Sequence, residues 1–286
     1  MKVLVTGGSG FIGSHIVDKL VEKGHKVTVY DIKPPLRKDV RFIRGEIRDP
    51  RAVLRAAKGQ KIIFHIAAFS NIDLVKDDPL ITIECNIQGT ANVLEAARRN
   101  GVQRVIFASS VYVYGDRGHL YTTAKVASEM LCKDYYTLYG LPYTILRFGT
   151  AYGPRSRQAD VISIFVRRAM ADQPLVINGT GKQKRNFIYV EDIAKGCVKA
   201  LASKYVNAVY DLKSRKSISI VKLAVLINKL YKNDKPIKFN MSRYDDHQGT
   251  AEKKPAAILV AKNILQRDTG LVEGIRKYMN WLQGKQ

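Results

Sequence analysis

The sequence predicts an α/β fold, a doubly wound parallel sheet followed by a smaller α/β part toward the carboxyl end. Three observations predict it. Short apolar runs alternate with helix-like segments through the first half of the chain, a glycine turn joins the first run to the first helix, and the alternation loosens after Gly153. Strands that are almost continuously apolar are typical of a parallel sheet covered by helices on both faces.

The amino-terminal segment gives a strand, a turn, a helix and a second strand. Residues 2–6, KVLVT, form a short apolar run that ends in the glycine turn GGSG. The segment 11–24 then carries Ile12, Ile16 and Leu20 at helical spacing and stops at a glycine. The run KVTVYD that follows is the second strand.

The alternation continues to residue 148. Further strands are expected at 41–46, 61–68, 104–110 and 143–148, and helices at 49–59, 79–101 and 122–140. In the looser part we expect a loop at 152–158, strands at 175–179 and 208–214, a strand running into a helix at 184–203, and helices at 161–174, 220–232 and 270–283.

The composition is that of an ordinary globular protein, with 286 residues of which 46% are hydrophobic and 26% charged. No apolar stretch approaches the roughly 20 residues that span a bilayer, so we expect a cytoplasmic protein with no membrane partner. The cysteines, Cys85, Cys132 and Cys197, are too scattered for a disulfide framework, and the histidines lack metal-ligand spacing. We therefore expect no metal site, and we interpret His65 as a structural residue at a strand end.

The charge is unusual, because 48 Lys and Arg against 25 Asp and Glu give a formal +23. Such a charge attracts nucleic acid, anionic lipid or a doubly negative small substrate. The basic residues are spread along the chain and form no tail, so we expect a generally basic surface and no nucleic-acid partner. The alternative is electrostatic steering of an anionic substrate into a cleft.

Gly7, Gly10 and Gly13 lie directly after the first strand and at the start of the first helix. Glycines in this pattern allow a tight turn, close approach of the backbone to a pyrophosphate, and close packing of helix on strand, while the helix amides hold the phosphates. Together with Asp31 at the end of the second strand, they predict a Rossmann-type dinucleotide site.

The carboxylate of Asp31 would hydrogen-bond a ribose 2′-hydroxyl and repel a 2′-phosphate, so NAD is favoured. Lys33 and Arg37 nearby leave NADP open. We expect residues 1–153, with 185–214 returning to them, to form the NAD-binding Rossmann domain. Residues 154–184 and 215–286 would form the smaller, interleaved substrate-binding domain.

Tyr121 and Lys125 are four residues apart at the start of the helix expected at 122–140. A free phenol has a pKa of about 10, and an ammonium one turn away on the same face would lower it. This pair suits a group that exchanges a hydroxyl proton with a substrate while a hydride leaves or reaches the adjacent carbon.

These motifs occur in one order that resembles the extended short-chain dehydrogenase/reductases, specifically the NAD-dependent epimerase/dehydratase family that acts on nucleotide sugars. The matching runs extend over nearly the whole chain: VTGGSGFIGSH, GEIRD, FHIAAF, NIQGTANVLEAA, FASSVYVYG, YTTAK, LRFGTAYGPR, GTGKQKRNFIYVEDIA and GLVEGIRKYMNWL. The resemblance implies a homodimer that pairs the helices at 79–101 and 122–140, and a nucleotide-sugar substrate, most simply a UDP-sugar.

The resemblance also assigns roles to residues. Tyr121 would be the acid/base, Lys125 its partner, and Ser110 the hydroxyl that hydrogen-bonds the reacting sugar oxygen. The residues expected to bind NAD are Gly7, Gly10, Phe11, Ile12, Gly13, Asp31, Glu46, Ile47, Ala67, Ala68, Phe69, Asn86, Tyr121 and Lys125. Those expected to bind substrate are Ser110, Thr150, Arg185 and Arg243, the last in a run, SRYDDHQG, that matches the family only loosely.

The residues after Ser110 bear on the reaction. Dehydratases of this family carry an acidic pair there and decarboxylating members a glutamate, whereas this chain has Val111 and Tyr112. We therefore expect a nucleotide-sugar 4-epimerase that works through a 4-keto sugar. The alternatives are an NAD-dependent dehydrogenase or reductase of another hydroxyl-bearing substrate and, from a different class, a non-catalytic NAD-binding protein.

Three departures from the family pattern concern the sugar pocket. Only the run DRGHL separates the sequence VYG from Tyr121, where family epimerases have a longer loop. Thr150 falls where the family commonly has an asparagine, and Gly149 where it has a bulky aromatic residue. These three differences predict an altered surrounding for the sugar.

Overall fold

The computed structural model describes residues 1–70, 78–115, 120–241, 258 and 260–284. Its centre is an eight-stranded sheet in the order β14-β11-β6-β5-β4-β1-β2-β3, with every neighbouring pair parallel. The strands are β1 (Lys2–Thr6), β2 (Lys26–Asp31), β3 (Arg41–Arg44), β4 (Ile62–His65), β5 (Arg104–Ser110), β6 (Tyr143–Phe148), β11 (Ala208–Leu212) and β14 (Lys262–Asn263). The predicted doubly wound parallel sheet is confirmed.

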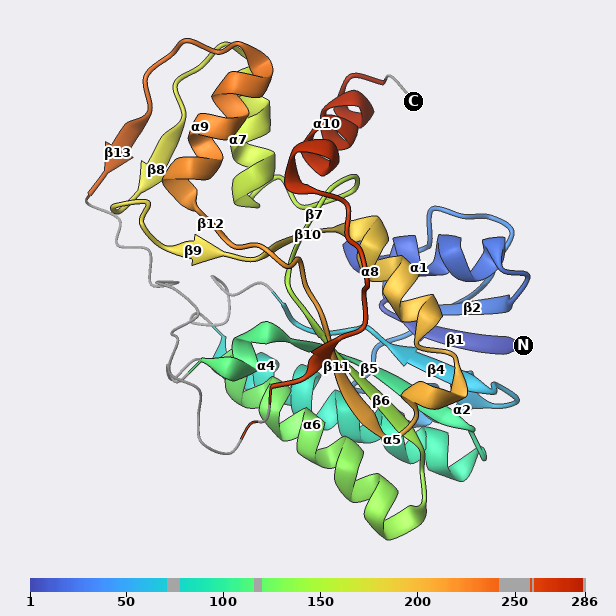
Figure 1. The fold of residues 1–286 in the computed structure, drawn as a ribbon. Helices are drawn as coiled ribbons and strands as arrows, with labels where there is room; N and C mark the ends of the chain where they lie inside the picture. Colours follow the sequence, from blue (N-terminus) through green and yellow to red (C-terminus); the bar gives the residue numbers. More distant parts are fainter. Residues whose placement is uncertain (71–77, 116–119, 242–257, 259, 285–286) are drawn as a thin grey trace.

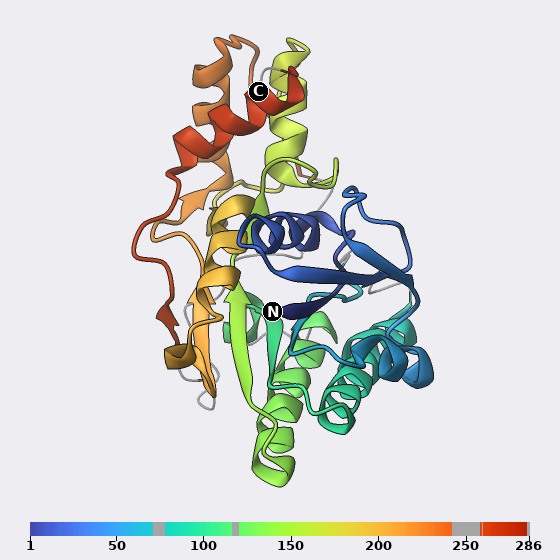
Figure 2. The same ribbon diagram turned by 90° about the vertical axis from the view of Figure 1, so that its right-hand side faces the viewer.

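Helices cover both faces of this sheet (Figures 1 and 2). One face carries α1 (Phe11–Glu22) and α8 (Val190–Lys199), and the other carries α2 (Pro50–Ala57), α5 (Gly89–Arg99) and α6 (Leu120–Tyr139). Because strand side chains alternate, Val3 and Val5 join the core under α1 and α8, while Leu4 joins the core under the other three helices.

Local signals explain where these helices begin. Asp49 caps α2, because its carboxylate accepts from the backbone N–H of Arg51 and Ala52, and Pro50 occupies the first helical position. Gly10 precedes α1 without a side-chain cap, so the first amides of α1 are not used by a capping side chain.

The segment expected as one helix at 79–101 is instead interrupted. It divides into α4 (Pro79–Ile83), a π-helical turn at Glu84–Gln88 and α5. The carbonyl of Asn86 in that turn accepts from the hydroxyls of Thr90, at 2.6 Å, and Ser128, at 2.8 Å. Side-chain hydroxyls that bond a helix carbonyl in this way disturb the regular backbone ladder.

The smaller part of the chain has its own core and lies beyond the carboxyl edge of the sheet (Figure 1). It contains α7 (Val161–Met170), α9 (Ile220–Tyr231) and α10 (Leu271–Leu282). Three two-stranded pairs accompany these helices: β7 (Thr150–Tyr152) with β10 (Phe187–Tyr189), β9 (Lys184–Arg185) with β12 (Ile218–Ser219), and β8 (Val176–Asn178) with β13 (Lys238–Asn240).

Candidate active site

The glycine turn has the geometry that a dinucleotide cradle needs. Gly7 follows β1 with φ +72°, and a Cβ placed on it would lie 2.6 Å from the backbone nitrogen of Ala67. A Cβ on Gly13 would lie 2.0 Å from the carbonyl oxygen of Gly7. Only glycine fits at these two positions, so the backbone at the start of α1 stays open to a phosphate group.

Asp31, at the end of β2, is fixed beside this turn. Its two carboxylate oxygens accept from the backbone N–H of Ser9, at 3.0 Å, and of Lys33, at 3.1 Å. The hydroxyl of Ser9 donates to the carbonyl of Lys33 and closes the arrangement. The carboxylate is thus held at the position from which a ribose hydroxyl is bound in dinucleotide folds.

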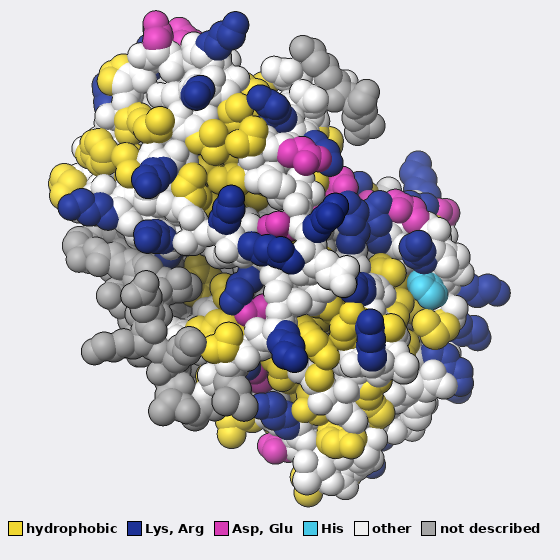
Figure 3. Space-filling model, in the orientation of Figure 1, with side chains coloured by type: hydrophobic (Ala, Val, Ile, Leu, Met, Phe, Trp, Pro, Cys, Tyr) yellow, Lys and Arg dark blue, Asp and Glu magenta, His cyan; other side chains and the backbone are white. Residues whose placement is uncertain are grey.

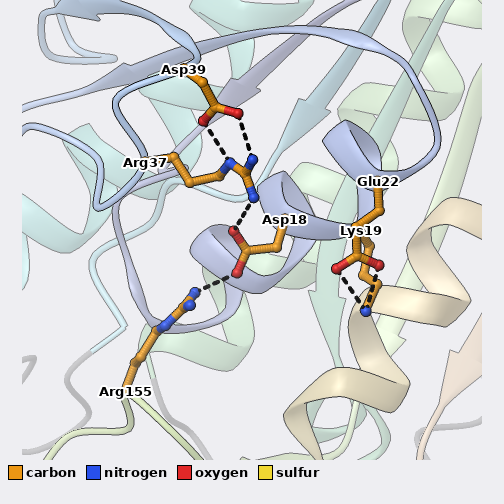
Figure 4. Close-up of polar contacts among 6 residues, drawn as sticks. All are labelled: Asp18, Lys19, Glu22, Arg37, Asp39 and Arg155. Atoms are coloured by element: carbon orange, nitrogen blue, oxygen red, sulfur yellow. Dashed lines mark hydrogen bonds and ion pairs between the residues drawn. The ribbon is translucent and has the colours of Figure 1, made fainter.

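Arg37, one of the two cations that left NADP open beside Lys33, already has carboxylate partners. It pairs with Asp39 at 2.5 Å and with Asp18 of α1 at 3.4 Å. Asp18 also binds Arg155 at 2.7 Å, so this aspartate lies between two arginines (Figure 4). These contacts engage the guanidinium that a 2′-phosphate would require, which agrees with a preference for NAD.

Asn86 supports the predicted cofactor wall through the backbone. Its side-chain oxygen accepts from the N–H of Phe69 at 2.7 Å, and its amide nitrogen donates to the carbonyl of Phe69 at 2.9 Å. Both ends of the amide are therefore used to fix the segment after β4 that includes Ala67 and Ala68.

Glu46 and Ile47, expected near the adenine, lie after β3. The carboxylate of Glu46 pairs with Arg48 at 2.5 Å, and its carbonyl accepts from the Tyr30 hydroxyl at 2.8 Å. Ile47 is buried against Gly89, where a Cβ would lie 2.7 Å from the isoleucine side chain. The glycine at the start of α5 thus lets the helix approach this segment closely.

Tyr121, Lys125 and Ser110 come together at the carboxyl edge of the sheet. Tyr121 and Lys125 lie one turn apart at the start of α6, and Ser110 ends β5. The Ser110 side chain is near enough to the Tyr121 hydroxyl to lower the pKa of the phenol, and its Oγ accepts from the backbone N–H of Tyr112 at 3.2 Å. Lys125 donates from Nζ to the carbonyl of Ala108 at 2.7 Å, and its Nζ lies 5.7 Å from the centre of the Tyr121 ring.

The protonation of this group differs from the expectation that lysine lowers the phenol pKa. Burial, followed by the neighbouring Tyr112, raises the pKa of Tyr121, and the Ser110 hydrogen bond and the charge of Arg157 lower it only partly. Burial also lowers the pKa of Lys125 to about 8. For both pKa values, the loss of contact with water is the largest influence. The phenol is therefore protonated at rest.

The predicted substrate residues lie on neighbouring segments. Thr150 of β7 donates its N–H to the carbonyl of Asn186. Asn186 directly precedes β10, the strand that pairs with β7. Arg185 of β9 is buried and pairs with Ile218 of β12. Arg243 lies outside the described residues.

The space around Gly149, where the family pattern has an aromatic residue, is occupied by neighbouring residues. A Cβ there would lie 3.1 Å from the carbonyl and side-chain oxygens of Asn186 and 3.1 Å from Cβ of Lys213. Asn186 and Lys213 therefore occupy the surroundings of this position, and neither was recognised in the sequence.

His65 has the structural role expected of it. Its Nδ1 lies 2.8 Å from the Thr6 hydroxyl and its Nε2 lies 3.1 Å from the Thr90 hydroxyl. Burial lowers the pKa of this imidazole to about 3, so it is neutral. Within the described ranges, no group of three or more potential ligands could hold a metal ion.

Comparison with known proteins decides the family. Residues 3–212 match the model of the NAD dependent epimerase/dehydratase family. The chain belongs to this family. The resemblance inferred from the motifs is therefore confirmed, the protein is an enzyme of an NAD-dependent family, and NAD is its cofactor.

Individual relatives of the family have related names. The chain is 32% identical to a Methanocaldococcus jannaschii protein provisionally named UDP-glucose 4-epimerase, over 98% of each chain. It is 34% identical to a UDP-N-acetyl-alpha-D-glucosaminuronate decarboxylase of Bacillus cytotoxicus, over 80% of each. Among solved structures, the UDP-glucose 4-epimerase of Thermotoga maritima in complex with UDP-glucose matches with a TM-score of 0.87, 27% identity and 99% coverage of each chain.

Proposed function

We propose that this family member is an NAD-dependent nucleotide-sugar 4-epimerase. The observation that carries the proposal is that Tyr121 at the start of α6 and Ser110 at the end of β5 act on one another, with Lys125 one turn along α6. Val111 and Tyr112 stand where other reactions of the family use carboxylates. Neither a valine nor a tyrosine replaces the acid and base that a dehydration requires beyond Tyr121.

Bound NAD supplies an acceptor that takes a hydride from a sugar carbon and gives it back. Tyr121 removes the proton of the sugar 4-hydroxyl and later returns it, while the Ser110 hydroxyl holds the same oxygen. Because the phenol is protonated at rest, proton removal requires stabilisation of the phenolate. The Ser110 hydrogen bond and the charge of Arg157 both act in that direction. The 4-keto sugar rotates within the site before the hydride returns to its other face.

The proposed substrate is a UDP-sugar or a UDP-uronate. The names of the relatives support the class, and Arg185 would bind the diphosphate through its planar guanidinium. Arg243 is proposed as a second diphosphate contact and Thr150 as a contact to the sugar. Lys and Arg side chains are spread over the face drawn in Figure 3 and would favour an anionic substrate.

The decarboxylase among the relatives makes decarboxylation of a UDP-uronate the second candidate. The geometry favours epimerisation, because the carboxylate of Glu129, one turn after Lys125, is bound by two nitrogens of Arg147 at 2.8 and 2.6 Å. A carboxylate held in this way is not available as the extra proton donor or acceptor.

The predicted domain roles, oligomeric state and location are part of the same proposal. Residues 1–153 and 185–214 would bind NAD, and 154–184 and 215–286 the substrate, except that β14 (Lys262–Asn263) returns to the edge of the central sheet beside β11. A homodimer through α5 and α6 is supported by exposed apolar side chains on α6, namely Met130, Tyr136, Leu138 and Tyr139. No helix in the described part of the chain is long and apolar enough to cross a bilayer. A cytoplasmic location stays a prediction, and three free thiols agree with a reducing compartment.

The test is incubation of the protein and NAD with a panel of UDP-sugars and UDP-uronates, with the products resolved by chromatography. We expect 4-epimers to interconvert without accumulation of NADH, and Tyr121→Phe to lower kcat by about a hundredfold or more. Tyr112→Phe removes a neighbouring phenol and should keep most of the activity. Release of CO₂ would indicate the decarboxylase, and stoichiometric NADH the dehydrogenase; NAD binding without any turnover would favour the non-catalytic alternative.

A further inference from the structure

A buried ion pair lies directly behind the proposed catalytic residues. Glu129 of α6 and Arg147 of β6 face each other with side chains that are 5% and 4% exposed. Glu129 also accepts a hydrogen bond of 2.5 Å from the hydroxyl of Ser109, the residue before Ser110. The pair therefore joins α6, the end of β5 and β6.

The other side of Arg147 is fixed as well. Its Nη1 donates to the hydroxyl of Tyr114 at 2.9 Å, and that hydroxyl donates to Asp211 of β11 at 2.8 Å. Asp211 in turn pairs with Lys213 at 2.5 Å. Every charge in this chain of contacts has a partner of opposite sign, as buried charges require.

A buried ion pair is weak evidence for a gain in stability, since apolar side chains of the same volume are often as stable. Its position is more informative. Three consecutive residues at the end of β5 meet α6: the Ala108 carbonyl accepts from Lys125, the Ser109 hydroxyl donates to Glu129, and the Ser110 side chain acts on Tyr121. The three partners on α6 are four residues apart, on one face of the helix.

The position of Tyr121 on α6 makes these contacts important. Tyr121 is the second residue of α6, so its placement depends on how α6 contacts the sheet. A displacement of about 1 Å between reacting groups can cost about a hundredfold in rate. The Ser109 bond to Glu129 is the contact that fixes α6 to the strand end without itself meeting a substrate.

We propose that Ser109, Glu129 and Arg147 are positioning residues that hold Tyr121, at the start of α6, beside Ser110 at the end of β5. The proposal rests on the proposed function in one respect, that Tyr121 and Ser110 act on the same substrate oxygen. Loss of the Ser109 hydroxyl then lowers kcat by about tenfold and leaves KM for the nucleotide sugar and for NAD within about twofold.

The test compares Ser109→Ala with Thr144→Val in the full-length protein loaded with NAD. Thr144 is a suitable control because its buried hydroxyl donates to the carbonyl of Tyr205 at the opposite end of β6. Each change deletes one buried hydroxyl, but only the hydroxyl of Ser109 donates to Glu129. The measurements are kcat, both KM values, and hydrogen–deuterium exchange of the peptide covering 120–126.

For Ser109→Ala we expect a lower kcat and faster exchange at 120–126. Thr144→Val should change neither quantity. Ser109→Thr restores the hydroxyl donor, so both kcat and the exchange rate should return toward the wild-type values. A kcat for Ser109→Ala equal to that of Thr144→Val, with unchanged exchange, overturns the proposal. If the wild-type protein converts no UDP-sugar, the proposed function fails by itself, and the exchange at 120–126 still decides whether Ser109 holds the start of α6.

Discussion

Lys125 of α6 donates a hydrogen bond to the carbonyl of Ala108 at 2.7 Å while its side chain is removed from water. This ammonium lies 4.8 Å from the centre of the Phe107 ring and 5.7 Å from that of Tyr121. Neither ring offers a full negative charge, so burial is the main influence on the protonation of the lysine.

The pH dependence of stability follows from that burial. The pKa of Lys125 falls from 10.5 to about 8 on folding, so between pH 8 and 10.5 the unfolded chain binds more protons and stability should rise with pH. At pH 7 the buried ammonium costs about 3 kcal/mol. Lys125→Met should therefore be more stable than wild type at pH 7 by up to this amount, with the gain shrinking toward pH 10.5.

Urea denaturation of both proteins from pH 7 to pH 10 measures the effect. Lys133→Met, an exposed lysine on the same helix, is the matched control and should show no such trend. A difference between Lys125→Met and wild type that does not change with pH would contradict the assignment of a lowered pKa.

Gly13→Ala tests the dinucleotide cradle. The added Cβ would meet the backbone of Gly7 and Gly8 at 2.0 to 2.9 Å, and backbone cannot move aside as a side chain can. We expect the free energy of unfolding to fall by about 2 kcal/mol or more and NAD affinity to fall at least about tenfold. Gly270→Ala, with no atom within 4 Å of the new Cβ, should cost less than about 1 kcal/mol.

Asp31→Asn tests the choice between NAD and NADP. Removing the charge while keeping the shape should lower the ratio of the NADP dissociation constant to that of NAD by about tenfold, because a 2′-phosphate is no longer repelled. Adding Asp39→Asn should lower it further, since Arg37 loses its shorter ion pair. Glu22 lies on the same helix as Asp18, and in Figure 4 it pairs with Lys19. The control Glu22→Gln should therefore leave the ratio unchanged.

The local parts of the site could be predicted from the sequence, and the long-range parts could not. The glycine turn and the spacing of Tyr121 and Lys125 depend on neighbours in the chain. At the interruption Glu84–Gln88, the Asn86 carbonyl accepts from Thr90, which is four residues away, and from Ser128, which is 42 residues away. The contact with Ser128 could not be predicted from the local sequence.

The buried ion pair was missed for the same reason, although two weak signals existed. Arg147 is a charge inside an otherwise apolar strand, and Glu129 follows Lys125 by four residues on one helix face. Either could have indicated a partner, but only the fold brings them together. The raised pKa of Tyr121 was also beyond the sequence, because it depends on burial and on the neighbouring ionisable phenol of Tyr112.

The basic balance predicts a dependence on salt. Attraction between a +23 protein and a dianionic substrate is screened as ionic strength rises. We expect kcat/KM for the UDP-sugar to fall several-fold from about 50 to 500 mM salt, with kcat almost unchanged. Lys184 is exposed and adjoins Arg185 in the sequence, so Lys184→Glu should reduce this salt dependence. A wild-type kcat/KM that does not change with salt would argue against steering.

In the proposed mechanism, one active site removes a hydride from carbon 4 of a nucleotide sugar and returns the same hydride to the other face. The most direct measurement uses a UDP-sugar deuterated at that carbon, with the product examined by mass spectrometry and NMR in the presence of excess unlabelled NADH. The proposed mechanism predicts that the 4-epimer keeps its deuterium at carbon 4. Loss of the label to the NADH pool, or deuterium-labelled NADH without an epimer, would contradict it and indicate a dehydrogenase.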